Sequence, residues 1–236
     1  MRWLRSILFS AQIYLMMVLM AIVFIPFALF SRDWAVYACH TWCRWVIWSA
    51  SWMVGVKVDV RGMPPSKPVL IAAKHQSFFD IIIIFLSVPK GRFIMKQQLI
   101  FAPILGQFAL KIGCIPVDRG KRGQAVADMV GRAIKDSAYP GQLIIYPQGT
   151  RVPPGQKRAY KVGAAALYEA MGQTCIPVAT NVGLFWPKFG TLHPGTAVVE
   201  FLDPIPSGLA RDEFLGLIED RIETCSDALI AQADRA

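Results

Sequence analysis

The stretch VLIAAKHQSFFD, residues 69–80, places one histidine and one carboxylate on either side of a short turn. His75 follows an apolar run typical of a buried strand, and Asp80 precedes a second apolar run, IIIIFL. On one helix, side chains five residues apart would point about 140° away from each other. If His75 ends a strand and Asp80 begins a helix, the turn can bring them together. A carboxylate bonded to one imidazole nitrogen leaves the other nitrogen to accept a proton from a hydroxyl.

The same spacing also suits a loop hydrogen bond, or a helix N-cap at Asp80. No serine or cysteine stands at an obvious third position of a triad. We therefore interpret the pair as a base that activates a substrate hydroxyl without a covalent enzyme intermediate. A hydrolase in which His75 activates water is an alternative, but no nucleophile motif or metal-ligand cluster supports it.

Three basic residues follow apolar runs that are typical of strands. Lys96 follows FIM, Arg119 lies in GCIPVDRGKRG, and Arg151 ends IIYPQGTR. Ligands of open α/β sheets bind at the carboxyl ends of the strands, where His75 is also expected. The pattern predicts a phosphate site beside a general base, whereas each cation alone would suit a solvated surface position. In the same turn, Gly149 would let the backbone approach a ligand, and Thr150 could donate a hydrogen bond.

Beyond residue 56, short apolar runs alternate with longer amphipathic segments. This alternation predicts an α/β fold with a central, mostly parallel or mixed sheet flanked by helices. Strands are expected at residues 57–61, 69–73, 92–95, 114–117, 142–146, 175–180 and 197–202. Helices are expected at residues 80–86, 99–111, 124–135, 160–171 and 211–231.

The first 56 residues have a different composition. Residues 6–31 carry no charge and are long enough to cross a bilayer core, with a kink or break expected at Pro26. Residues 34–56 are apolar but contain Arg44 and five tryptophans, which indicates a segment at the membrane interface or one returning through the membrane. A buried core helix is the alternative for this segment. We predict a membrane-embedded helical pair in residues 1–56 and a catalytic domain in residues 57–236.

The orientation of this pair follows from charge and cysteine content. Arg2 and Arg5 favour a cytoplasmic N-terminus by the positive-inside rule, and a pair of helices would return the chain to the same side. The five cysteines are odd in number and form no Cys-x-x-Cys, which indicates free thiols in a reducing compartment. We therefore expect the catalytic domain to face the cytoplasm, at the inner membrane if the source is bacterial. A metal site at Cys39, His40 and Cys43 is disfavoured by the tryptophan-rich, apolar surroundings.

Composition also restricts the partners. The 236 residues are 54% hydrophobic and only 17% charged, against about 25% charged in ordinary soluble domains. The net charge of +9 favours anionic partners such as lipid headgroups or phosphorylated substrates. Nucleic acid is disfavoured because the basic residues are scattered and the aromatic residues gather in the N-terminal segments.

Taken together, the ordered motifs resemble those of the 1-acylglycerol-3-phosphate acyltransferases, also called lysophosphatidic acid acyltransferases. KHQSFFD is similar to the family's His-x4-Asp block, and GCIPVDRG, YPQGTR and CIPVA are similar to the three blocks that follow. FIMK lies where the family usually has a lysine. The resemblance covers most of residues 55–205, and four blocks in order are more specific than any one of them.

The resemblance implies that a fatty acyl group passes from CoA or acyl carrier protein to the 2-hydroxyl of lysophosphatidate. It implies that His75 is the base and Asp80 its orienting partner, and that the phosphate is held by Lys96, Arg119 and Arg151. No metal or other cofactor is expected, and membrane lipids are expected partners. The alternatives are the same chemistry on another lysolipid, such as a lyso-aminolipid, and a non-catalytic lipid-binding membrane protein.

One position departs from the family's pattern. The third block usually reads Glu-Gly-Thr-Arg, whereas here Gln148 stands before Gly149. Glutamine keeps the shape and hydrogen-bonding capacity of glutamate but loses its charge, so it can neither act as a base nor pair with a cation. We expect Gln148 to be a structural or acceptor-positioning residue.

Overall fold

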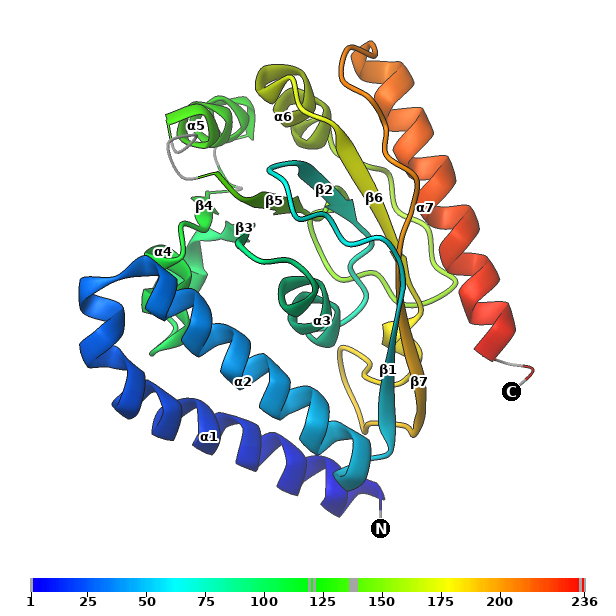
Figure 1. Ribbon diagram of the computed structural model, residues 1–236. Helices are drawn as coiled ribbons and strands as arrows, with labels where there is room; N and C mark the ends of the chain where they lie inside the picture. The colour runs from blue at the N-terminus through cyan, green and yellow to red at the C-terminus, as the bar shows by residue number, and fades with distance from the viewer. Residues whose placement is uncertain (1, 119, 121, 136–139, 234, 236) are drawn as a thin grey trace.

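The computed structural model describes residues 2–118, 120, 122–135, 140–233 and 235. Seven strands form one mixed sheet in the order β1-β7-β6-β2-β5-β3-β4, in which β6 and β7 are antiparallel and the other neighbours are parallel (Figure 1). The strands are β1 Val56–Gly62, β2 Leu70–Ala73, β3 Gly91–Lys96, β4 Ile115–Val117, β5 Gln142–Ile145, β6 Cys175–Thr180 and β7 Gly195–Phe201. All seven expected strands are present, and the α/β class is confirmed.

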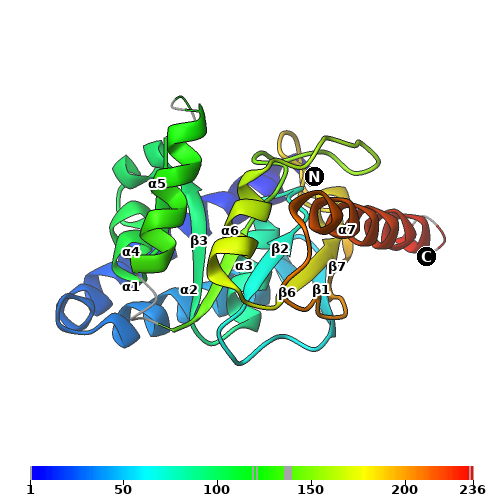
Figure 2. The same ribbon diagram turned by 90° about the horizontal axis from the view of Figure 1, so that it is seen from above.

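The helices are α1 Arg2–Phe30, α2 Arg32–Met53, α3 Phe79–Ser87, α4 Leu105–Lys111, α5 Arg122–Lys135, α6 Gly163–Met171 and α7 Arg211–Ala233. Short 3-10 helices occupy Gln97–Phe101 and Val182–Leu184. In Figure 1, α2 and α3 lie below the sheet, and α5, α6 and α7 lie on the opposite side. Figure 2, seen from above, shows α5, α6 and α7 along that upper face.

The central strand β2 explains why both faces of the sheet are covered. Its residues are all buried, and they alternate between two hydrophobic cores. Leu70 and Ala72 belong to the core between the sheet and helices α5, α6 and α7. Ile71 and Ala73 belong to the core between the sheet and helices α2 and α3. Successive side chains of a strand point to opposite faces, so an uninterrupted apolar run suits a strand buried on both sides.

The two N-terminal helices form an antiparallel pair. Ser31 separates them and caps α2, since its hydroxyl accepts a hydrogen bond from the N–H of Asp33. Two tryptophans of α2 tie the helices together: Trp42 donates to the carbonyl of Ile13 at 2.9 Å, and Trp45 donates to the side chain of Gln12 at 2.7 Å. These two rings therefore stabilise the pair, and do not only mark a membrane interface.

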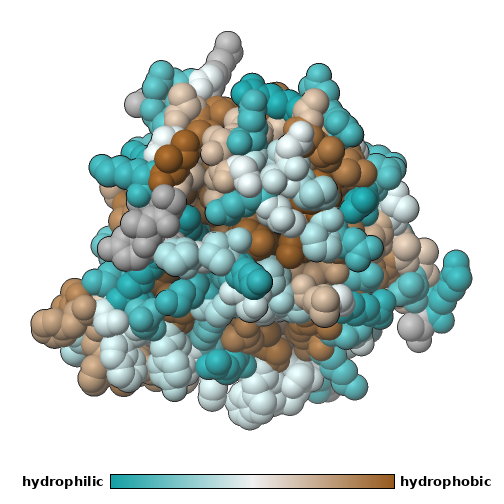
Figure 3. Space-filling view, turned by 45° about the horizontal axis from the view of Figure 1, so that its top comes forward, coloured by the Kyte–Doolittle hydropathy of each residue, from teal (hydrophilic) through white to brown (hydrophobic). Residues whose placement is uncertain are grey.

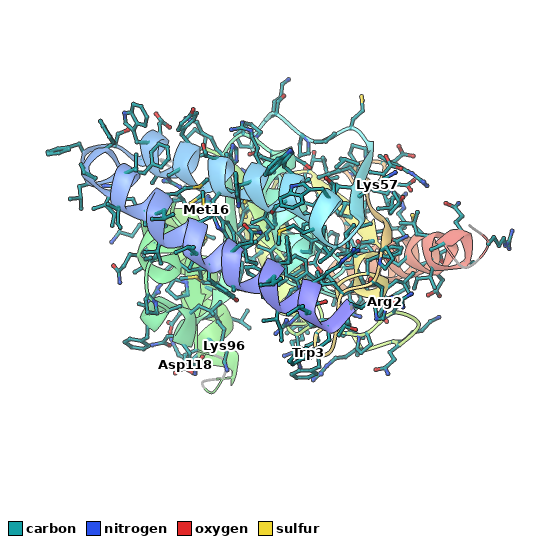
Figure 4. The ribbon with its side chains drawn as sticks, turned by 90° about the horizontal axis from the view of Figure 1, so that it is seen from below. Arg2, Trp3, Met16, Lys57, Lys96 and Asp118 are labelled. Atoms are coloured by element: carbon teal, nitrogen blue, oxygen red, sulfur yellow. The ribbon has the colours of Figure 1, made fainter. Side chains whose placement is uncertain are left out.

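The helical pair packs against the α/β part of the chain. Figure 4 shows it from below, with α1 in front and Met16 midway along it. The hydroxyl of Ser6 accepts a hydrogen bond from the N–H of Leu192 at 3.0 Å, and Lys111 donates to the carbonyl of Leu29 at 2.8 Å. Buried residues of both helices belong to the same core as α3, so the pair and the sheet share one interior. The division at residue 56 stays a prediction.

The outward face of α1 is apolar. By length and composition, α1 can cross a membrane, and only 17% of its most apolar window is buried. Its exposed side chains include Ile22, Val23, Leu29 and Phe30. Figure 3 shows apolar side chains at the lower left, over the turn between α1 and α2. Among the described residues, α2 does not meet the same criterion.

Three expectations about helices need correction. Residues 99–111 are not one helix: the chain turns at Pro103 and at Ile104, whose φ is +63°, before α4 begins. A proline interrupts a helix because it lacks an N–H and restricts the preceding residue. Of the kink or break expected at Pro26, the break is wrong, since α1 continues to Phe30. The helix expected from residue 160 begins at Gly163.

Candidate active site

His75 and Asp80 lie together, as their spacing predicts. His75 follows the end of β2, and Asp80 stands in the first turn of α3. Nδ1 of His75 lies 2.9 Å from Oδ1 of Asp80. Because the carboxylate accepts this bond, Nδ1 carries the proton and Nε2 is left to accept a proton from a substrate.

Asp80 is fully buried behind the histidine, and its orientation is fixed by the backbone. Its second oxygen, Oδ2, accepts hydrogen bonds from the N–H groups of Gln76 at 2.8 Å and Ser77 at 2.7 Å. The turn that joins the two residues therefore also holds the carboxylate in place. Asp80 is not the N-cap of α3, because that position is occupied by Phe78.

An aromatic ring supports the imidazole from one side. The rings of His75 and Tyr146 stack with centroids 4.1 Å apart, and Phe93 stacks on Tyr146 at 6.2 Å. Burial, and then the nearby charge of Asp80, raise the pKa of Tyr146 well above its ordinary value. Tyr146 is therefore a neutral ring at physiological pH that limits the positions open to His75.

A cavity of about 670 Å³ opens beside the histidine. Its polar lining residues include His75, Lys96, Thr150, Arg151 and Lys188. The rest is mostly apolar and is built from α1, α2, α3, β3 and α4. Its lining there includes Ile13, Met17, Ala21, Ala38, Cys43, Phe78, Ile82, Phe85, Phe93, Leu105, Phe108 and Cys114. The polar residues can hold charge, and the apolar lining suits a hydrocarbon.

The structure brings together most of the predicted phosphate ligands. Lys96, at the end of β3, and Arg151 line the same cavity as His75. Figure 4 shows Lys96 beside Asp118, which follows the neighbouring strand β4. Arg119 lies outside the described residues, so its predicted role stays a prediction.

Lys188 is a cation of the cavity lining that the sequence interpretation missed. It lies eight residues beyond the end of β6, so proximity to a strand end did not identify it. The signal available was its place in the aromatic run FWPKF, after a strand that runs parallel to β2.

The turn after β5 requires its glycine. Gly149 has a φ of +69°, a conformation that side chains with a Cβ rarely adopt. A Cβ there would also come within 2.9 Å of Nζ of Lys161. Gly149 and Thr150 line the cavity, whereas Gln148 is buried away from it and donates to Glu223 at 3.2 Å. This geometry favours the structural alternative for Gln148.

Within the described ranges, no three or more His, Cys, Asp or Glu side chains are grouped closely enough to hold a metal ion. The described side chains of the site are a histidine, a carboxylate bonded to it, and cations that line a largely apolar cavity.

Comparison with known proteins gives consistent matches. Residues 57–181 match the family model described as Acyltransferase. The 1-acyl-sn-glycerol-3-phosphate acyltransferase of Pseudomonas aeruginosa is 30% identical over 69% of this chain. The human 1-acyl-sn-glycerol-3-phosphate acyltransferase alpha is 27% identical over 75% of this chain. The matched part spans 65% of the length of each of these relatives, which is slightly less than two thirds.

The fold also matches a solved structure. The crystal structure of the 1-acyl-sn-glycerophosphate (LPA) acyltransferase PlsC from Thermotoga maritima superposes with a TM-score of 0.80. The superposition covers 97% of this chain and 98% of that chain, at 21% sequence identity. At this identity, the likeness shows a shared fold.

Proposed function

This chain belongs to the acyltransferase family, and on that premise we propose that it acylates the 2-hydroxyl of lysophosphatidate to give phosphatidate. The acyl donor is a thioester, acyl-CoA or acyl carrier protein. The observation that carries the proposal is the His75–Asp80 pair beside a largely apolar cavity that Lys96, Arg151 and Lys188 also line. The named relatives are acyltransferases of this type, which supports the same acceptor.

The chemistry follows from the pair. Nε2 of His75 accepts the proton of the acceptor hydroxyl while the oxygen attacks the thioester carbonyl. A C–O bond forms, the C–S bond breaks, and the imidazolium returns the proton to the leaving thiolate. The products are one ester and one free thiol. Asp80 holds the Nδ1–H and stabilises the positive ring between the two proton transfers.

The cations that line the cavity would bind the acceptor phosphate. Arg151 suits bidentate contact with phosphate oxygens, and Lys96 and Lys188 would each contribute a point charge. Arg119 stays a proposed fourth ligand. Thr150 would donate a hydrogen bond to the acceptor.

The apolar part of the cavity would hold the acyl chain. Cys114 also lines this cavity, but burial raises the pKa of its thiol to about 11. At neutral pH it is a neutral thiol and a poor nucleophile, so a covalent acyl-cysteine is disfavoured. A thioester donor is already activated, and the proposed reaction therefore needs no further cofactor.

The helical pair would seat the protein on a membrane. The apolar outward face of α1 and the exposed Trp3, Trp48 and Trp52 suit contact with lipid. We place the catalytic part on the cytoplasmic face, at the inner membrane if the source is bacterial, because a pair of helices returns the chain to the side of Arg2 and Arg5.

The test is acyl transfer by the detergent-purified protein. Acyl-CoA and acyl carrier protein would be offered separately, with lysophosphatidate or its dephosphorylated monoacylglycerol as acceptor. We expect transfer to lysophosphatidate, little transfer to monoacylglycerol, and no effect of a chelator. Equal transfer to both acceptors would contradict the proposed phosphate site. Transfer only to a lyso-aminolipid would change the acceptor. No transfer with any pair would favour a non-catalytic lipid-binding protein.

A further inference from the structure

A buried ion pair lies directly behind the proposed base. Nζ of Lys74 is 2.5 Å from Oε2 of Glu223, and the two residues are only 2% and 6% exposed. Lys74 is the residue before His75, whereas Glu223 lies on α7, 149 residues further along the chain. A buried charge is costly unless it is paired and hydrogen-bonded, so each of these groups depends on the other.

The second oxygen of Glu223 is hydrogen-bonded to two residues of the segment that follows β5. Oε1 accepts a hydrogen bond from Nε2 of Gln148 at 3.2 Å and from the hydroxyl of Tyr160 at 2.9 Å. Gln148 is 1% exposed and stands directly before Gly149. Burial, and then the charge of Glu223, raise the pKa of Tyr160, so its hydroxyl stays protonated and donates this bond.

The helix that carries Glu223 is itself firmly packed. Phe214, Ile218 and Ile222 of α7 are fully buried in the core shared with β2 and β5. One turn further, the hydroxyl of Ser226 accepts a hydrogen bond from the N–H of Thr180 at the end of β6. The carboxylate is therefore held by a rigid support, and not by a mobile terminus.

From these contacts we propose that Glu223 is a positioning residue for acyl transfer. It fixes the backbone that bears His75 through Lys74, and the turn that bears Thr150 and Arg151 through Gln148. The proposal rests on the acyl transfer proposed above. In this arrangement, the carboxylate of Glu223 sets the distance between His75 and Arg151.

Charge determines which substitutions report on this role. Glu223→Gln keeps the shape but leaves the Lys74 ammonium without its counter-ion. Gln148→Glu places a second carboxylate against the first, and like charges at that distance repel. The double variant Gln148→Glu/Glu223→Gln moves the negative charge by one side chain and keeps the total charge. A partial recovery in the double variant would report coupling between the two positions.

The experiment compares these variants in detergent, with Asp220→Asn as the matched control. Asp220 is exposed on the same helix, so its variant removes a charge from α7 outside the network. We expect Glu223→Gln and Gln148→Glu each to lower kcat by about ten- to a hundredfold, since small misplacements of reacting groups have effects of this size. We also expect the acceptor KM to rise in both, and the double variant to recover at least part of each loss. Asp220→Asn should match wild type.

Hydrogen exchange of the peptides spanning residues 74–78 and 147–160 gives a readout that does not need activity. Exchange should be faster in Glu223→Gln than in wild type and unchanged in Asp220→Asn. If wild type were inactive with every substrate, the proposed function would fail, but the exchange data would still test the restraint. Should Glu223→Gln fail to fold, Tyr160→Phe removes one restraint without touching the ion pair and should lower kcat a few-fold. Wild-type kcat, KM and exchange in the folded variants would overturn the proposal.

Discussion

The N–H of Val152 donates a 2.8 Å hydrogen bond to the carbonyl of His75. The proposed base and the residue after Arg151 are thus joined directly, although they come from the ends of two neighbouring parallel strands, β2 and β5. A hydroxyl bound at His75 and a phosphate bound at Arg151 would be held by one connected piece of backbone. Catalysis by orientation requires such a fixed separation.

Replacing the base should reduce turnover without detaching the protein from lipid. General-base catalysis contributes about 10²–10⁴ in rate, so we expect His75→Ala to lower kcat by this order. Asp80→Asn should cause a similar loss, because an amide there no longer fixes the tautomer of His75. Initial rates and vesicle sedimentation measure the two properties. A His75→Ala enzyme within tenfold of wild type would contradict the assignment.

Loss of a cation that lines the cavity should act on acceptor binding. A hydrogen bond to a charged group contributes about 1.5–3 kcal/mol, so we expect Arg151→Ala to raise the lysophosphatidate KM by roughly ten- to a hundredfold. Lys188→Ala should raise it less, since its flexible point charge makes no bidentate contact. Lys57→Ala is the control, because Lys57 lies far from Lys96 in Figure 4. An unchanged KM in Arg151→Ala would remove Arg151 from the phosphate site.

Paired changes in the apolar cavity should shift chain-length preference in opposite directions. Ala38 of α2 is buried and Phe108 of α4 is partly buried, and both line the cavity. Ala38→Phe should favour shorter acyl donors, and Phe108→Ala longer ones. Overpacking costs about 1–3 kcal/mol, so thermal unfolding should accompany the rate measurements. If both variants kept the donor preference of wild type, the acyl chain would have to bind outside this cavity.

The pH dependence of the alkylation rate of Cys225 tests the environment of this thiol on α7. Burial, and then the charge of Glu200, raise the pKa of Cys225 to about 11. Only the thiolate reacts, so its alkylation rate should keep rising about tenfold per pH unit up to pH ~10, where an ordinary thiol has reached its plateau. Peptide mapping by mass spectrometry follows this cysteine alone. Glu200→Gln should lower the pKa and speed the reaction at pH 8. A plateau near pH 9 in wild type would contradict this environment.

The sequence was informative where function depends on neighbours in the chain. His75 and Asp80 are only five positions apart, and apolar runs identified the central strands β2, β5 and β6, because burial on both faces leaves a strong hydrophobic signal. The segment at residues 99–111 was misjudged because the helix-breaking effect of Pro103 was overlooked, and because the positive φ of Ile104 has no signature in side-chain type. The break expected at Pro26 was wrong because α1 accommodates the proline within its last two turns.

Contacts between residues that are far apart in the chain could not be predicted from local sequence patterns. Lys74 looks like the last residue of an apolar strand, and Glu223 looks like one of many charges on an amphipathic helix. Nothing in their local context indicates that they meet as a buried ion pair. Gln148 was recognised as unusual, but its partner on α7 was visible only in three dimensions.

The most direct test of the account follows thioester cleavage and ester formation in one reaction. Release of free thiol from acyl-CoA and formation of phosphatidate would be measured together for wild type and His75→Ala, with and without lysophosphatidate. Wild type should release thiol only when the acceptor is present, in a one-to-one ratio with phosphatidate, and His75→Ala should lose both. Thiol release without acceptor would indicate a hydrolase, and undiminished transfer by His75→Ala would contradict the central role of this histidine.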